Sequence, residues 1–275
     1  MERTVIWAIA QRELREALRN KWLWLYALGF AGLALALSRA GLAAAGYAGL
    51  GGFGRTAASL VNALLMFVPL IGLTVGAGTL AGERERGTLL YLLSQPINRS
   101  ELFIGKAVGA GLAVLTALAL GLGLAGLGLA AAGGDAAATY LALGGYTFLL
   151  ALAALGLGLI ISAVARKGAA ASAAAMLLWL LLVFLGDLGV IGLTLSLRPT
   201  PAVLFSSLLI NPLQIFKLGA IHSLRAGLDV LGPVGQYATY RFGDALPLLL
   251  IGLLLAWIIA SFTLAFALFQ RQVGE

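Results

Sequence analysis

Cysteine is absent from this chain of 275 residues, and histidine occurs once, at position 222. Without cysteine the chain can form neither a disulfide nor a thiolate metal site, and a lone His222 in a loop has no evident partner for acid–base catalysis. The sequence also contains no HExxH, GxSxG or GxxxxGKS/T pattern, so it lacks the motifs of zinc proteases, hydrolases and phosphate-binding loops. We therefore expect no catalytic, cofactor-binding or metal-binding residue here, and no enzyme.

Charged residues make up only 11% of the chain, whereas hydrophobic residues make up 61%, and the mean hydropathy is +1.01. A water-soluble domain of this size could not hide so much apolar surface from water. The sequence therefore predicts a protein of the lipid bilayer, and we expect it in a bacterial inner membrane.

Six apolar runs reach the length of about 20 residues that a transmembrane helix needs. They cover residues 22–42, 60–81, 107–131, 139–164, 170–192 and 246–269. The alternating pattern of a β-barrel strand does not appear in these runs, whereas glycines recur at helical spacing. The pairs are Gly72/Gly76, Gly78/Gly82 and Gly105/Gly109. Because such pairs let helices approach closely in lipid, we predict a single all-α domain over residues 1–275 with six transmembrane helices.

The formal net charge of +7 comes from lysines and arginines that are spread between the apolar runs. They form no continuous basic patch, so we expect no nucleic-acid partner. With both termini in the cytoplasm, twelve of the eighteen basic residues fall in inner segments, which agrees with the positive-inside rule. The sequence thus predicts that both termini are cytoplasmic.

Two segments outside the apolar runs are predicted to be ordered. Residues 4–20 place Ile6, Ile9 and Leu14 on one helical face, which predicts an amphipathic helix in the membrane interface. Such a helix either only anchors the chain before the first span or has a functional role of its own. Residues 193–245 contain four prolines and are too long for a simple turn,. We expect this segment to form short helices that cap the outer end of the bundle or lie at the lipid boundary.

The densest cluster of charges lies in residues 82–106, "GERERGTLLYLLSQPINRSELFIGK", between the second and third apolar runs. A helix through the leucines must end before Pro96, and Asn98 with Glu101 forms a capping-box pair that begins the next helix. The pattern predicts a short inner helix with mixed charges and an apolar ridge. It is either a stub in the interface or a docking element for a cytoplasmic protein.

The same stretch resembles the signature of type 2 ABC exporter permeases. The matching residues are Glu83, Glu85, Gly87, Thr88, Leu89, Leu90, Pro96, Gly105 and Lys106. The N-terminal "AQRELREALRNKWLW" and the segment "NPLQIF" at 211–216 extend the resemblance over nearly the whole chain. It implies a second copy of this chain and two copies of a separate cytoplasmic ATPase that binds ATP and Mg²⁺.

The resemblance also implies which residues contact the ATPase. Residues 83–94 correspond to the coupling helix between spans 2 and 3, residues 165–169 to the second inner loop, and the N-terminal helix to a third part of the interface. The residues concerned are Glu83, Arg84, Glu85, Arg86, Gly87, Thr88, Leu89, Leu90 and Pro96; Arg166 and Lys167; and Arg12, Glu13, Arg15 and Arg19.

Within that family, the N-terminal "RELREALRNKWLW" and the segment "LGPVGQYATYRFGDALP" are most similar to the NosY-type branch, which serves copper-site maturation of nitrous oxide reductase. That branch implies a periplasmic solenoid-like partner and export of a small sulfur-containing or copper-related species. A permease of a drug, lipid or glycan exporter and a non-transporting scaffold for a periplasmic partner are the alternatives. An ion-coupled carrier would need ionisable residues near the middle of the spans, where the sequence has mainly serine and threonine.

Overall fold

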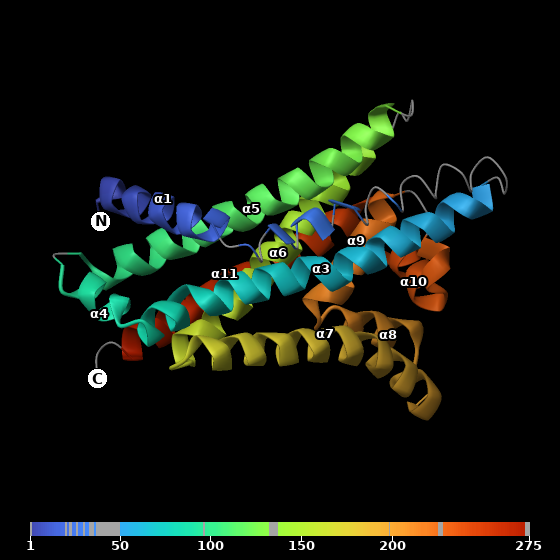
Figure 1. Ribbon diagram of the computed structural model, residues 1–275. Helices are drawn as coiled ribbons and strands as arrows, with labels where there is room; N and C mark the ends of the chain where they lie inside the picture. The colour runs from blue at the N-terminus through green and yellow to red at the C-terminus, as the bar shows by residue number, and fades with distance from the viewer. Residues whose placement is uncertain are drawn as a thin grey trace.

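The computed structural model describes residues 2–19, 50–95, 97–131, 137–197, 199–224 and 228–272, and some residues between 21 and 36. In this part of the chain all regular secondary structure is helical, which confirms the all-α prediction (Figure 1). The helices are α1 (Arg3–Arg19), α3 (Leu50–Glu85), α4 (Thr88–Leu93), α5 (Arg99–Ala131), α6 (Ala137–Val164), α7 (Gly168–Leu197), α8 (Pro201–Leu208), α9 (Pro212–Ser223), α10 (Pro233–Phe242) and α11 (Leu246–Gln272).

Within the residues that the structure describes, five helices are long and apolar enough to cross a membrane, and they correspond to five of the six predicted spans. They are α3, α5, α6, α7 and α11. The remaining predicted span, 22–42, lies mostly outside the described residues. A further apolar segment is the pair α8 and α9, which is bent by 109° at the short break between the two helices.

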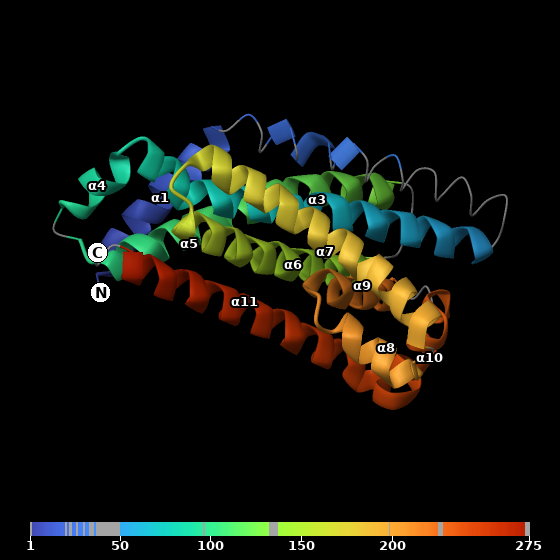
Figure 2. The same ribbon diagram turned by 90° about the horizontal axis from the view of Figure 1, so that it is seen from below.

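The long helices run side by side between two ends of the bundle (Figures 1 and 2). One end carries α4 together with both chain termini, and we call it the α4 end; the opposite end carries α10, and we call it the α10 end. Helix α6 packs against α3, α5, α9 and α11, whereas α7 packs mainly along α3 and leaves most of its surface exposed.

Glycines allow two pairs of helices to approach closely. A Cβ atom at Gly72 of α3 would lie 2.5 Å from the carbonyl oxygen of Ala151 in α6. A Cβ atom at Gly109 of α5 would lie 2.6 Å from the carbonyl oxygen of Ala10 in α1. Contacts this short leave no room for a side chain, so the predicted packing role of Gly72/Gly76 and Gly105/Gly109 is confirmed. The third predicted pair makes no such contact with a neighbouring helix.

The segment predicted as an outer cap does form short helices, and three of them begin with proline, a residue that suits the first helical turn,. Helix α9 goes deeper than a cap, however, because it contacts α3, α6, α7 and α11. Its residues 212–216 and 218–221 are all buried. The helix is apolar around most of its circumference, which suits an element enclosed by other helices.

Candidate coupling site at the α4 end

The charged segment is divided between two helices. The resemblance implied a single coupling helix over residues 83–94, but α3 continues to Glu85 and α4 begins only at Thr88. The break occurs at Gly87, whose φ of 72° is easily reached only by glycine,. Glu83, Arg84 and Glu85 therefore lie in the last turn of α3, and their side chains point in different directions around that helix.

Glu83 belongs to a buried ion cluster that joins three helices. The Nζ atom of Lys106 in α5 lies 2.9 Å from Oε1 of Glu83 in α3 and 2.7 Å from Oε2 of Glu13 in α1. Lys106 is 2% exposed and Glu83 is 3% exposed. Removing one partner of a buried ion pair typically costs about 3–5 kcal/mol, because the other charge is left without compensation. The cluster therefore holds the ends of α1, α3 and α5 together.

Several charges in this cluster act on the pKa of Glu13. Burial raises the pKa of Glu13 above its ordinary value, and the carboxylates of Glu83 and Glu16 raise it further, whereas Lys106 lowers it,. Arg12 lies 3.2 Å from Glu16 and 3.7 Å from Glu83. Lys106 and Arg12 thus neutralise the carboxylates of Glu13, Glu16 and Glu83, which lie close together between α1 and α3.

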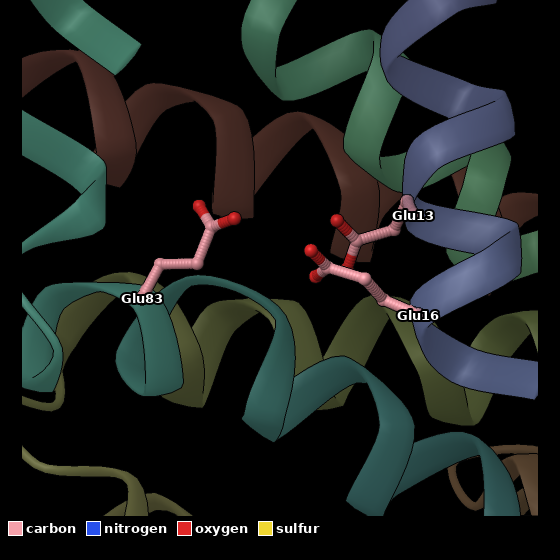
Figure 3. A group of neighbouring side chains, drawn as sticks. All are labelled: Glu13, Glu16 and Glu83. Carbon is pink, nitrogen blue, oxygen red and sulfur yellow. The ribbon is translucent and has the colours of Figure 1, made fainter. Parts of the chain in front are cut away.

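The carboxylates of Glu13, Glu16 and Glu83 raise the question of a metal site, since each has an oxygen within 4.8 Å of the others (Figure 3). Lys106, however, has its ammonium group within 3 Å of two of these carboxylates, and Arg12 pairs with the third. A metal cation would have to share this space with two fixed positive charges. The cluster fits an ion-pair network better than a metal centre, and it offers no nitrogen or sulfur ligand for copper.

Arg84 caps the end of another helix. Its Nη1 donates to the carbonyl oxygen of Ala165 at 2.5 Å, and its Nη2 donates to that of Ala163 at 3.2 Å. These carbonyls lie at the C-terminus of α6, where a positive charge is favourable. Nearby, the hydroxyl oxygen of Ser162 accepts from the backbone N–H groups of Leu80 and Ala81 at 2.8 and 2.9 Å. The end of α6 is thus joined to the last turns of α3.

Glu85 makes the corresponding contact with α7. Its Oε2 accepts a hydrogen bond of 2.9 Å from the backbone N–H of Gly168, the first residue of that helix. A carboxylate at a helix N-terminus satisfies a free N–H group and interacts favourably with the helix dipole. The fourth charged residue of the segment, Arg86, donates from Nε to the carbonyl oxygen of Gly82 within its own turn and is exposed.

Helix α4 is attached to the bundle by one face. Leu89 and Leu92 are buried, whereas the ring of Tyr91 is 67% exposed. The predicted capping box at the start of α5 is confirmed, because Oε2 of Glu101 accepts from the backbone N–H of Asn98 at 3.2 Å. Pro96 and the side chain of Leu90 lie outside the described residues.

The other predicted site residues lie at the same end of the molecule. Arg166 and Lys167, between α6 and α7, are exposed, as are Arg12, Arg15 and Arg19 on α1. Between α1, α3, α5 and α7 lies an open cavity of about 740 Å³ whose lining includes Thr74, Ser172 and Met176. Glu13, Arg19 and Glu83 line it too, so the ion cluster forms one of its walls.

Sequence reasoning did not single out Lys106 as the partner of Glu13 and Glu83, nor Tyr91 as an exposed ring. A signal for Lys106 was present, because a lone charge that begins an apolar span usually has a buried partner. For Tyr91 there was none, since five apolar residues in succession do not indicate which one faces outward.

Comparison with known proteins identifies the family. The model of the ABC-2 family transporter proteins matches residues 7–272. The chain belongs to this family. It is 34% identical to a protein of Pseudomonas aeruginosa named "Probable ABC transporter permease protein NosY", over 98% of both chains. A protein of the same name from Stutzerimonas stutzeri is 32% identical over 98% of this chain and 99% of its own length.

The predicted resemblance to ABC-2 permeases of the NosY type is thereby confirmed. The chain is a membrane permease subunit of an ABC transporter. Permeases of this kind work with a cytoplasmic ATPase, which supplies the energy that the permease lacks. The geometry at the α4 end can therefore be interpreted in terms of contact with such a partner.

Proposed function

We propose that the α4 end faces the cytoplasm and that α4 is the element on which the ATPase presses. The observation that carries this proposal is the position of Tyr91, an exposed ring on a short helix that is fastened to the bundle by Leu89 and Leu92. Exposed cations at the same end are Arg86, Arg166 and Lys167, beside the exposed carboxylate of Glu85, which already accepts from Gly168. They agree with a cytoplasmic location and suit a groove on the ATPase with acidic side chains.

In this proposal the transporter contains two copies of the chain and two ATPase subunits. ATP and Mg²⁺ bind to the ATPases, their closure moves α4, and the attached helices follow. The permease supplies the pathway and the moving parts, while the chemical step takes place in its partners. Export is the direction that the family resemblance implies.

We further propose that the transporter serves copper-site maturation of nitrous oxide reductase, because the chain is similar to NosY permeases over 98% of its length. A small sulfur-containing or copper-related species is the proposed cargo, and a periplasmic solenoid-like protein is the proposed third partner. The ion cluster at the α4 end has no soft ligands for copper, so we assign no copper site to the described part of this chain,.

The docking proposal can be tested with a pair of tyrosines. Tyr91→Ala on α4 removes the exposed ring at the α4 end, and Tyr240→Ala removes a ring that is 94% exposed on α10 at the other end. We expect Tyr91→Ala to reduce the amount of ATPase that copurifies with the tagged chain, because an aromatic anchor is lost from the contact. Tyr240→Ala is expected to retain it. Equal recovery of the ATPase with both variants would contradict the proposal.

The proposed pathway is tested by complementation. A denitrifying bacterium that lacks its own NosY permease should regain copper-loaded nitrous oxide reductase when this chain is expressed together with its cognate ATPase and periplasmic partner. The measurement is the copper content and visible absorption of the purified reductase. If the chain assembles with its ATPase but the reductase stays without copper, a general exporter becomes the better interpretation.

A further inference from the structure

Three of the charged residues that were expected to meet the ATPase are already engaged within the chain. Glu83 is buried against Lys106 and faces Glu13. Arg84 donates to the carbonyl oxygens at the end of α6, and Glu85 accepts from the first residue of α7. These three consecutive residues therefore connect the end of α3 to α1, α5, α6 and α7.

We propose that Glu83, Arg84 and Glu85, which we call the α3 clamp, are positioning residues that make the α4 ends of α1, α3, α5, α6 and α7 move as one rigid unit. This inference rests on the proposed function, in which the ATPase presses on α4. The clamp would transmit that force to five helices at once. The contact with the ATPase itself is left to exposed residues such as Tyr91, Arg86 and Lys167.

The directions of the three side chains explain why one helical turn can do this. Successive residues of a helix are separated by about 100°, so three in a row point to three different neighbours. Each contact also uses a group that needs a partner: a buried ammonium, free carbonyls at a helix C-terminus, and a free N–H at a helix N-terminus. Separation of any of these helices would leave such groups unpaired, which favours joint movement over sliding.

The attachment of α4 fits the same scheme. Only Arg86 and Gly87 separate the clamp from α4, and the hydroxyl of Thr88 donates to the carbonyl oxygen of Glu83 at 3.3 Å. With Leu89 and Leu92 buried, α4 is held directly beside the clamp. A push on α4 would therefore reach the clamp without a flexible linker in between.

The test measures distances within one chain in the assembled transporter. Because the chain has no cysteine, Trp7→Cys on α1 and Val164→Cys at the end of α6 provide two unique sites for spin labels, and both positions are more than half exposed. Labelled chains are mixed with an excess of unlabelled chains, so that pairs within one chain dominate. The distance is measured by electron paramagnetic resonance without nucleotide and with ATP and vanadate.

A rigid unit predicts the same distance distribution in both states. A chain labelled only at Trp7→Cys measures the distance between two copies, and this distance should change on ATP binding. If the distance within one chain shifts with nucleotide, the helices move separately and the inference is overturned. If the wild-type chain recruits no ATPase, or no distance between copies changes, the proposed function fails instead, and the coupling role of the clamp fails with it.

Two substitutions at Glu85 separate an internal clamp from a direct contact. Glu85→Gln keeps an oxygen that can accept from Gly168, whereas Glu85→Ala removes it. Because Glu85 contacts α7, the second label for these variants is placed at Leu177→Cys on α7, a position that is 62% exposed, in place of Val164→Cys. We expect Glu85→Gln to behave as wild type and Glu85→Ala to bind the ATPase normally but to show a broadened, nucleotide-dependent distance between α1 and α7. Loss of ATPase binding in both variants would assign Glu85 to the contact surface and overturn the inference. If Glu85→Ala lowers the melting temperature but leaves the distances as in wild type, the clamp only stabilises the fold, and the inference is overturned as well.

Discussion

At the α4 end, a buried ion cluster and ionic side chains of α3 join neighbouring helices, whereas at the α10 end amide groups, aromatic rings and the partly exposed ion pair Lys217–Asp187 hold the short helices. There, Nδ2 of Asn211 donates to the carbonyl oxygen of Leu182 at 2.7 Å, and Nε2 of Gln214 donates to Asp187 at 3.0 Å. The ring of Phe205 packs against Tyr237 and Phe242 at centroid distances of 5.8 and 5.4 Å. Ionic contacts are strong and directional, while neutral ones are individually weaker.

The two ends of the bundle therefore differ in how strongly their helices are held together. An end that receives force from a partner, as we propose for the α4 end, benefits from contacts that resist separation. There, Glu83 is buried against Lys106, and Arg84 and Glu85 bond the ends of α6 and α7. Helix α9 at the α10 end is held mainly by packing, by hydrogen bonds of its amide side chains and by an ion pair from Lys217 to Asp187, whose carboxylate is 57% exposed, and such exposed pairs contribute little. Such contacts cost less to rearrange, so we expect the α10 end to change shape more readily than the α4 end.

The largest effect is expected from removing the central cation of the α4 end. Lys106→Ala leaves the carboxylates of Glu13 and Glu83 buried without their ammonium partner. We expect the free energy of unfolding to fall by about 3–5 kcal/mol, measured by thermal unfolding in detergent micelles. The double variant Glu83→Gln, Lys106→Met removes opposite charges together and should recover part of the loss. If Lys106→Ala is as stable as wild type, the ion cluster does not stabilise the contact between α1, α3 and α5.

A smaller effect is expected at the α10 end. Asn211→Ala removes both the hydrogen bond to Leu182 and the cap at the start of α9, where the side chain accepts from the N–H of Leu213 at 3.0 Å. The expected loss is about 1–2 kcal/mol, measured in the same way. Ser206→Ala is the control, because this exposed hydroxyl donates only within α8. If Asn211→Ala costs as much as Lys106→Ala, the contrast between the two ends is wrong.

The smallest effect concerns the pH dependence of the α4 end. The pKa of Glu13 is raised above 4.5 by burial, so above pH 4.5 the folded protein holds this proton more tightly than the unfolded chain does. Stability from this group therefore decreases as pH rises through that window. Glu13→Gln should remove this part of the dependence when melting temperatures are compared from pH 4.5 upward. The same slope in both proteins would mean that Glu13 titrates normally.

Much of the fold could be predicted because its signals are local. Apolar runs of sufficient length correspond to α3, α5, α6, α7 and α11. The glycine pairs at 72/76 and 105/109 are at real helix crossings. The capping box at Asn98 and Glu101 is also present. Each of these features depends on residues within a few positions of one another, so the sequence contains all the information needed.

The candidate site was harder to predict because its contacts link distant parts of the chain. Residues 83–85 were assigned to a coupling helix because the resemblance to ABC exporter permeases implied that helix over residues 83–94. They instead extend α3 by one turn, because their charges are satisfied by Lys106, the end of α6 and the start of α7. The depth of α9 was missed for a similar reason: apolar content predicts burial but does not specify which helices surround it.

The sequence by itself determined that this chain lies in a membrane, that its long segments are helices, and that a short helix runs through the leucines that precede Pro96. It did so because hydropathy, glycine spacing and capping act over short stretches of chain. Only the tertiary structure decided that Glu83 is buried, that Arg84 and Glu85 bond the ends of α6 and α7, and that Tyr91 is exposed. The reason is physical: a charge in a membrane protein is stable wherever it finds a partner, and that partner can be any residue that folding brings near.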